Sequence, residues 1–436
     1  MRKPKVLVIA EAANPEWVSV PLVGWSLSHA LREVADVHLV TQVRNRNAIK
    51  SAGLVEGRDF TAIDSEAIAR PMHRASTFLR MGKGKGWTTS TAINSLVYPY
   101  FEHLVWRRFG PDIQAGAFDI VHRVTPLSPT ANSSLAVKCR RAGVPFVLGP
   151  LNGGVPWPKG FDAERRRERE WLSYVRGIYK LNPARDAMFA ATSAVLAGSL
   201  HTASEVPSVA QDRTIYVPEN AIDPARFDFA SRQARPPNGP LRGAFVGRCV
   251  PYKGPDMVIE AALPLLREKR LCLDIVGDGP LLPELRRMAA QAPEGSVVFH
   301  GWLEHREVQS VLGRSDFLAF PSIREFGGGV VIEAMALGVV PLVADYAGPG
   351  ELVGPDTGFK VAIAQRPAFV EALRGTIEKI LADRARLPEM GESGRQLILS
   401  HFTWQAKAAQ VREIYDWVLG GGGEKPAFGF PAERRG

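Results

Sequence analysis

The sequence has 436 residues, of which 45% are hydrophobic and 23% are charged. These proportions are typical of a globular protein and exclude a chain that is disordered throughout. The length allows two domains with full hydrophobic cores, and no apolar run reaches the roughly eighteen residues that a membrane-spanning helix needs.

The formal net charge of +9 at pH 7 favours an anionic partner, such as a nucleotide, a nucleic acid or an anionic lipid surface. Nucleic acid is not expected, because the sequence shows no RNP-type aromatic strand, no zinc-finger spacing and no clear helix-turn-helix. The three cysteines have neither paired nor metal-type spacing, which argues against a disulfide framework or a zinc site and fits a reducing compartment. The apolar run at residues 5–10 is too short for a signal peptide, so a cytoplasmic protein is expected.

Short apolar segments alternate with helical patterns through the first half of the chain. Such alternation predicts a parallel, doubly wound α/β sheet, with ligands gathered at the carboxyl ends of its strands. The expected strands lie at residues 6–10, 34–41, 119–122, 145–149, 190–199 and 215–223, and the expected helices at residues 23–33 and 134–142.

The second half shows the same alternation after a stretch of low helix and strand propensity at residues 231–240, which is expected to be a linker. A second doubly wound sheet is therefore predicted. Its strands are expected at residues 241–248, 271–277, 297–301, 317–320 and 339–343, with a helix at residues 255–268.

Two segments of the first half interleave cationic and aromatic side chains. The first covers residues 80–87 together with residues 106–109, and the second covers residues 164–185, where apolar residues recur at helical spacing. Solvated loops and ordinary amphipathic helices show such patterns, and so does a surface that docks on an anionic membrane. Packing of an apolar face is the favoured interpretation, and membrane contact stays open.

The stretch at residues 324–338 is the most informative in the chain. It follows the apolar run at residues 317–320, so it predicts a buried strand, a glycine-rich turn and the start of a helix. Three successive glycines, Gly327, Gly328 and Gly329, let the backbone approach a ligand, and the first-turn N–H groups of a helix have no intrahelical partner. This architecture predicts an anion site.

Two glutamates flank the glycine-rich turn. Glu325 stands before the turn and Glu333 lies inside the helix, with seven residues between them. Either glutamate alone would be interpreted as a helix cap or a solvated helix charge. Carboxylates on both sides of a phosphate-binding turn can reach the hydroxyls of a sugar and of a ribose, and the pair has the form of the E-x7-E signature of retaining GT-B glycosyltransferases.

Arg248 and Lys253 follow the first strand of the second sheet. A guanidinium can hold a diphosphate through two parallel hydrogen bonds, and an ammonium five residues on adds a point charge to the same group. Together they would balance the charge that builds on a departing nucleoside diphosphate. Two exposed cations on a basic protein are the alternative, but their place at a strand end beside the glycine-rich turn favours the functional interpretation.

Several motifs of the second half occur in one order, and as a set they resemble the nucleotide-sugar half of the glycogen-synthase-like, family-four retaining glycosyltransferases, also called group 1 glycosyl transferases. The resemblance covers about residues 246–358, while the first half resembles that family only in outline. The motifs are Gly247-Arg248, Lys253-Gly254, Val276-Gly277-Asp278-Gly279-Pro280, Phe299-His300-Gly301, Pro321-Ser322, Glu325-Phe326-Gly327, residues 333–341 and residues 348–353.

The resemblance implies the GT-B architecture, in which two Rossmann-like domains face a central cleft. An N-terminal, acceptor-side domain is expected at residues 1–215, and a nucleotide-sugar-binding domain at residues 216–403. A helix at residues 404–419 is expected to return to the first domain. The glycine-rich tail at residues 420–436 is expected to be flexible.

The resemblance also implies roles for the matching side chains. Arg248 and Lys253 would bind the donor diphosphate, and Glu325 would contact the donor sugar near its reacting carbon. Glu333 would accept hydrogen bonds from the ribose hydroxyls.

Backbone groups complete the implied site. The N–H groups of Gly327, Gly328 and Gly329 would face sugar or phosphate, and the backbone around Gly301 and Trp302 would meet the base. Enzymes of this family are thought to react on one face of the sugar, with the leaving phosphate taking the acceptor's proton, so no protein base is required. No cofactor is expected beyond the nucleotide sugar substrate, and no metal, because no Asp-x-Asp element sits at a strand end and the basic pair can take that role.

The first half departs from the family pattern in two places. The loop at residues 11–15 lacks the usual early pair of glycines, and His122-Arg123-Val124 stands where many relatives carry His-x-His. His122 is either a catalytic residue at a strand end or a satisfied core histidine, and both interpretations stay open. The glycine-rich loop at residues 149–154 is a candidate acceptor-side or phosphate-side turn.

The predicted function is transfer of a hexose from a nucleoside diphosphate sugar to a glycan or lipid-linked acceptor, with retention of configuration. Cell-envelope polysaccharide or glycolipid assembly is the expected setting, in the cytoplasm or peripherally on the inner face of the membrane. Two alternatives keep the fold. One is a sugar-nucleotide epimerase, which needs no acceptor, and the other is a catalytically silent sugar-nucleotide or glycan-binding protein at a membrane surface.

Overall fold

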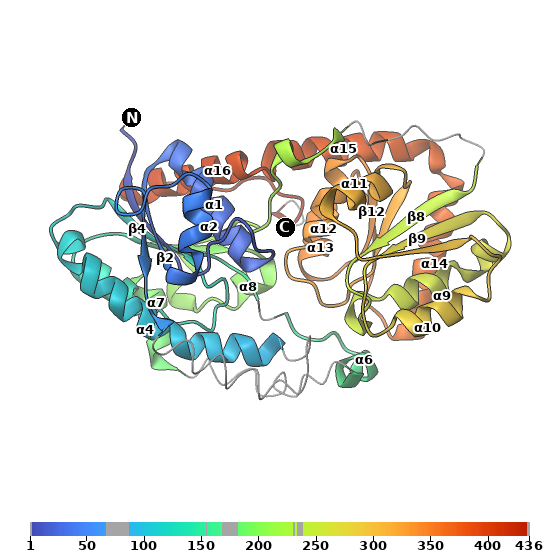
Figure 1. Ribbon diagram of the computed structural model, residues 1–436, viewed down its shortest axis with the longest axis horizontal. Coiled ribbons are helices and arrows are strands. Elements are labelled where there is room, and N and C mark those ends of the chain that lie inside the picture. Colours follow the sequence, from blue (N-terminus) through green and yellow to red (C-terminus); the bar gives the residue numbers. More distant parts are fainter. Residues whose placement is uncertain are drawn as a thin grey trace. The chain divides into compact units, whose positions relative to one another are not determined.

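The computed structural model describes residues 2–66, 87–153, 155–167, 182–229, 232 and 239–433, and the chain divides into two compact units. Unit 1 comprises Met1–Gly154, Arg169–Glu219 and Trp404–Phe428, and unit 2 comprises Val155–Glu168, Asn220–Thr403 and Gly429–Gly436. Each unit is built around one parallel β-sheet (Figure 1). In the part of the chain that the structure describes, no helix combines the length and the apolar character needed to span a membrane.

Unit 1 contains a seven-stranded sheet in the order β3-β2-β1-β4-β5-β6-β7, with every neighbouring pair parallel. Strands β4 and β5 are buried along their whole length, which is typical of a sheet covered by helices on both faces. Strand order reverses between β1 and β4, so this edge is the switch point at which ligands gather in such folds. The strands are β1 Lys5–Ala10, β2 Asp36–Gln42, β3 Phe60–Ile63, β4 Ile120–Thr125, β5 Phe146–Leu151, β6 Ala194–Ala197 and β7 Thr214–Tyr216.

Helices cover the two faces of this sheet through two hydrophobic clusters. On one face, α1 (Val20–Val34) lies beside α16 (Trp404–Leu419), as Figure 1 shows. Leu27 and Leu31 of α1 share a cluster with Val411 and Tyr415 of α16, so each helix buries residues four apart on one stripe. The other face is covered by α4, α5 and α7. The remaining bounds are α2 Arg46–Ser51, α4 Trp87–Gln114, α5 Ser134–Arg141, α7 Pro183–Ala191 and α8 Leu200–Ser204.

Unit 2 contains a six-stranded sheet in the order β10-β9-β8-β11-β12-β13, again with every neighbouring pair parallel. Its strand order reverses between β8 and β11. Figure 1 shows α9, α10 and α14 on one face of this sheet and α11, α12 and α13 on the other. The strands are β8 Leu241–Val246, β9 Leu271–Val276, β10 Val297–Gly301, β11 Phe317–Phe320, β12 Val340–Ala344 and β13 Phe359–Val361. The helices are α9 Pro255–Arg267, α10 Leu282–Ala289, α11 His305–Gly313, α12 Gly329–Ala336, α13 Ala347–Leu352, α14 Arg366–Ala382 and α15 Leu387–His401.

Residues 106–109 of the first basic, aromatic segment lie on α4, and their two aromatic side chains pack inward. Phe109 is buried in the core of unit 1, and Trp106 packs against the same cluster with Lys138 Nζ 5.1 Å from its ring centre. This arrangement favours packing over membrane contact for residues 106–109. Residues 80–86 of that segment and residues 168–181 of the second one lie outside the described residues.

The structure differs from the expected domain division in where the chain changes unit. Residues 155–168 belong to unit 2 although they follow β5 of unit 1, and the later boundary falls after Glu219 rather than after residue 215. Helix α16 belongs to unit 1. Sequence periodicity shows which segments form elements, but it carries no information on which sheet a short connecting segment packs against.

The described residues of the glycine-rich tail extend to residue 433 and make several packing contacts. Phe430 is 1% exposed, and its ring centre lies 5.3 Å from that of Phe402 and 5.9 Å from that of His401. Lys425 Nζ donates to the carbonyl oxygen of Thr214 at 3.0 Å. The glycines of the tail predict flexibility, and burial of an aromatic side chain such as Phe430 opposes it.

Candidate functional site

The glycine-rich turn joins β11 to α12 and is held by close backbone packing. Gly328 has a left-handed φ of 58° and caps α12. A Cβ at Gly328 would lie 3.2 Å from Leu352 Cδ1 and 3.3 Å from Pro349 Cγ, and one at Gly348 would lie 1.8 Å from the carbonyl oxygen of Phe326. Glycine at these two positions therefore lets α13 pack directly on the turn, which fixes the backbone where the first N–H groups of α12 begin.

Lys253 and Glu325 form an ion pair at the ends of β8 and β11, which are neighbours in the sheet. Lys253 Nζ lies 2.7 Å from Glu325 Oε2, and the two side chains are 16% and 21% exposed. The ammonium also lies 5.1 Å from the ring centre of Phe320. Burial alone would lower the pKa of Lys253, but the charge and hydrogen bond of Glu325 outweigh it and raise that pKa above its ordinary value. The pair thus holds a fixed positive and a fixed negative group at the switch point of unit 2.

The loops after β8, β9 and β10 meet at the same edge of the sheet. The N–H of Gly247 donates to the carbonyl oxygen of Val276 at 3.0 Å, and that of Gly277 donates to the carbonyl oxygen of Gly301 at 2.7 Å. Arg248 is exposed beside this ladder, and its charge acts on Lys253. Trp302 follows Gly301 and is 73% exposed. An exposed cation and an exposed aromatic ring therefore lie at the same edge of the sheet as the ion pair.

Glu333 lies in the middle of α12 and is partly exposed. Its Oε1 lies 3.7 Å from Nε2 of His305 on α11, which is a weak, half-exposed contact. The sequence did not single out His305, because nothing local links it to a residue on the next helix. A carboxylate that is held only loosely can exchange this contact for hydroxyl donors of a ligand.

His122 lies in unit 1, apart from the residues above, and is fully buried on β4. Its Nδ1 is 2.6 Å from the hydroxyl of Tyr415, and its Nε2 is 2.7 Å from the carbonyl oxygen of Gly149. Burial lowers the pKa of His122 to about 4, against a smaller opposing effect of the Gly149 carbonyl. Both ring nitrogens are engaged within the core, so the arrangement favours the satisfied core histidine over the catalytic one.

The low pKa of His122 predicts that unit 1 loses stability in mild acid. The folded state holds this group neutral while the unfolded chain protonates near pH 6.5, so the unfolded state binds more protons. The contribution of His122 to the free energy of unfolding should therefore be fully present above about pH 6.5. The free energy of unfolding should fall by up to ~3 kcal/mol as the pH drops towards 4. Urea unfolding between pH 4 and 7 checks this. His122→Gln should flatten that part of the slope, whereas the matched change at the exposed His103, His103→Gln, should keep it.

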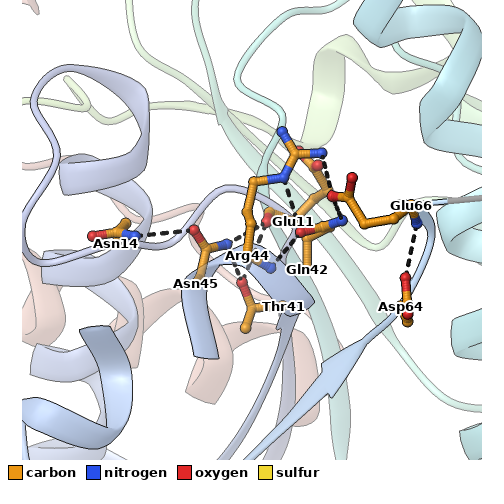
Figure 2. Close-up of polar contacts among 8 residues, drawn as sticks. All are labelled: Glu11, Asn14, Thr41, Gln42, Arg44, Asn45, Asp64 and Glu66. Atoms are coloured by element: carbon orange, nitrogen blue, oxygen red, sulfur yellow. Dashed lines mark hydrogen bonds and ion pairs between the residues drawn. The ribbon is translucent and has the colours of Figure 1, made fainter. Parts of the chain in front are cut away.

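A second group of polar side chains gathers at the carboxyl ends of β1, β2 and β3 in unit 1, as Figure 2 shows. Arg44 lies between Gln42 and Glu66. Its Nε is 2.9 Å from Gln42 Oε1, and its Nη2 is 3.3 Å from Glu66 Oε1. Asn45 donates to the carbonyl oxygen of Glu11 at 2.9 Å. Burial raises the pKa of Glu11, with Arg44 opposing and Glu66 adding to the effect. Sequence reasoning missed this polar edge, although Glu11 and Gln42 each stand where an expected strand ends.

Unit 2 contains the part of the chain that matches a known family. Residues 227–397 match the model described as "Glycosyl transferases group 1". Glycogen synthase of Mycobacterium tuberculosis is 33% identical over 208 residues, which cover 46% of this chain and 48% of that protein. The "GDP-mannose-dependent alpha-(1-6)-phosphatidylinositol monomannoside mannosyltransferase" of Mycolicibacterium smegmatis is 33% identical over 179 residues, which cover 39% and 46%. The chain thus spans about half the length of the curated relatives it matches.

Among solved structures, Anabaena Alr3699/HepE in complex with UDP and glucose superposes with a TM-score of 0.56 at 15% identity, covering 94% of this chain and 98% of that one. A likeness at this identity concerns the fold. Two parallel, doubly wound sheets in one chain define a protein of the GT-B class, which confirms the predicted fold. Residues 227–397 thus resemble the group 1 glycosyl transferases, the family that the motifs of the second half indicated.

Proposed function

We propose that this protein is a retaining glycosyltransferase that moves a hexose from a nucleoside diphosphate sugar to a glycan or lipid-linked acceptor. One observation carries the proposal. Within the family-matched region, the Lys253–Glu325 pair stands at the switch point of the sheet, next to the glycine turn that opens α12. A cation for a diphosphate and a carboxylate for a sugar are thereby held side by side.

The proposed donor site uses the edge formed by the ends of β8, β10 and β11. Arg248, Lys253 and the first N–H groups of α12 hold the diphosphate, whose charge grows as the bond to the sugar breaks. Glu325 contacts the sugar, and Glu333 accepts from the ribose hydroxyls. The base lies against the backbone at residues 301–302.

The proposed chemistry needs no protein base. The acceptor attacks from the face that the diphosphate leaves, and a phosphate oxygen takes the acceptor's proton, so the configuration at the reacting carbon is retained. Lys253 and Arg248 supply the positive charge for the leaving group, and on this proposal neither a metal nor a cofactor takes part.

The relatives support two kinds of acceptor. One relative is a glycogen synthase, which points to a glycan, and the name of the other includes phosphatidylinositol monomannoside, which points to a lipid-linked sugar. For this chain we propose a role in envelope polysaccharide or glycolipid assembly, in the cytoplasm or at the inner face of the membrane. The net charge of +9 supports contact with anionic lipid.

Donor binding tests the proposal directly. Thermal unfolding is followed with UDP, GDP and ADP and with their common sugar conjugates. A ligand at a hundred times its dissociation constant stabilises the folded state by roughly 2.7 kcal/mol, so the matching nucleotide should raise the Tm by several degrees. Arg248→Ala should remove most of that rise, and no rise with any nucleotide would contradict the proposal.

Product analysis separates the alternatives. Incubation of the matching nucleotide sugar with a pool of glycan and lipid-linked acceptors should yield a glycosylated product with the donor's anomeric configuration. Conversion of the nucleotide sugar alone into an isomer would identify an epimerase instead. Binding of the donor with no turnover across acceptors would favour a binding protein.

A further inference from the structure

Residues 155–167, here called the strap, leave the sheet of unit 1 after β5 and pack on unit 2. The C-terminal half of the strap, here called its distal half, contains α6 (Asp162–Arg167). Three of its residues contact side chains of unit 2. Phe161 is fully buried against Phe369, with ring centres 6.0 Å apart. Glu164 Oε1 lies 3.5 Å from Arg366 Nε, and Arg167 makes an exposed ion pair of 2.7 Å with Glu284. These contacts fasten one end of the strap to unit 2.

The other end of the strap places Trp157 between two loops of the proposed donor site. The guanidinium carbon of Arg324 lies 5.4 Å from the centre of the Trp157 ring. Tyr252 meets the same indole edge to face, with ring centres 6.5 Å apart. The hydroxyl of Tyr346 donates to the carbonyl oxygen of Pro156 at 2.8 Å and so holds the backbone next to Trp157. One indole therefore packs on side chains from two separate loops.

These two side chains directly precede the ion pair. Tyr252 is followed by Lys253, and Arg324 is followed by Glu325. The backbone already joins the loops, because the N–H of Ile323 donates to the carbonyl oxygen of Tyr252 at 2.9 Å. Trp157 adds a side-chain contact on each loop, one residue before the cation and one residue before the carboxylate.

Arg324 makes the contribution of Trp157 specific. Arg324 is 6% exposed, and a guanidinium at that depth has lost most of its water. A tryptophan face is the aromatic surface that attracts a cation most strongly, and the attraction grows with desolvation. The indole thus stabilises Arg324 in one orientation. Because Glu325 is the next residue, the position of its backbone is fixed as well.

We propose that Trp157 is a positioning residue of the donor site, holding Tyr252 and Arg324 so that Lys253 and Glu325 meet the donor diphosphate and sugar in register. This inference rests on the proposed function. It assigns part of the donor site to a segment that precedes the family-matched residues 227–397 in sequence. Trp157→Ala should weaken binding of the nucleoside diphosphate about tenfold, and Trp157→Phe should keep it within about threefold, because a smaller ring still offers an aromatic face.

Calorimetric titration at 25 °C with the nucleoside diphosphate that stabilises the unaltered protein measures the effect. Arg167→Ala is the matched control, since it removes an anchor at the distal end of the strap and should change the dissociation constant less than twofold. Tyr346→Phe deletes the hydrogen bond to Pro156 and should weaken binding about threefold. It also keeps the test available if Trp157→Ala does not fold. For the donor sugar, Trp157→Ala should raise KM and lower kcat together.

The outcomes separate the inference from the function on which it rests. Weaker binding by Trp157→Ala with recovery in Trp157→Phe supports the positioning role. Equal binding by Trp157→Ala and the unaltered protein overturns it and leaves the donor site intact. If Arg167→Ala weakens binding of the nucleoside diphosphate as much as Trp157→Ala does, the inference is also overturned. Any disturbance of the strap would then have the same effect, and Trp157 would have no specific role. If the unaltered protein binds no nucleoside diphosphate, the proposed function fails, and this inference fails with it.

Discussion

Replacing Glu325 with alanine is expected to lower kcat for sugar transfer by about 100-fold or more. Positive charge develops at the reacting carbon as the leaving group departs, and a fixed carboxylate beside it stabilises that charge more in the transition state than in the bound donor. Lys253 would also lose the partner that lies 2.7 Å away. Initial rates with saturating donor and acceptor measure the effect.

Two further variants make this expectation specific. Glu325→Gln keeps the shape and one hydrogen-bonding oxygen but removes the charge, so it should lose nearly as much kcat as Glu325→Ala. Glu378→Ala is the control, because Glu378 is an exposed carboxylate on α14 of the same unit. Transfer by Glu325→Ala at the unaltered rate would remove Glu325 from the proposed site.

Lys253→Met is expected to reduce kcat/KM for the donor about 1000-fold. The methionine keeps much of the length of the side chain but cannot neutralise the leaving diphosphate, and it leaves Glu325 as an unpaired, largely buried carboxylate beside a second anion. Because Glu325 raises the pKa of Lys253, the ammonium stays charged through neutral and mildly alkaline pH, so donor binding should not weaken over that range.

The same steady-state assay, run with Lys379→Met, controls for the loss of any cation from unit 2. Lys379 is exposed on α14 and should be replaceable without effect on donor kinetics. Donor titration of Lys253→Met at neutral pH should show weaker binding of the nucleoside diphosphate as well as slower turnover. Unaltered binding with slow turnover would place Lys253 on the sugar rather than on the diphosphate.

The geometry of the proposed donor site could be predicted from the sequence because its parts are local. The strand, the glycine turn and the helix that carry Glu325 and Glu333 lie within about twenty consecutive residues, and the turn needs glycine where a Cβ would collide. The approach of Lys253 to Glu325 follows from a further rule, since neighbouring strands of a parallel sheet end at one edge. The roles of these residues in transfer stay predictions.

Other features depend on contacts between residues that are distant in sequence, and no local pattern contains them. The apolar run around His122 predicts that it lies in a strand, but its partner Tyr415 is 293 residues away. Trp157 likewise looks like an ordinary aromatic residue in a connecting loop until Arg324 is brought against it. The buried position of Phe430 was missed for the same reason, because a glycine-rich composition says nothing of where a single side chain packs.

The way in which the chain divides between the two units limits how the protein can be cut or recombined. Each unit is assembled from three separate stretches of sequence, so neither unit corresponds to one contiguous fragment. A chimera that exchanges only residues 220–403 would carry the family motifs but would leave behind Trp157 and Phe430. Its proposed donor site would then have to be supported by a foreign strap. Engineering of donor specificity by domain exchange should therefore move residues 155–168 and the C-terminal segment together with the main block.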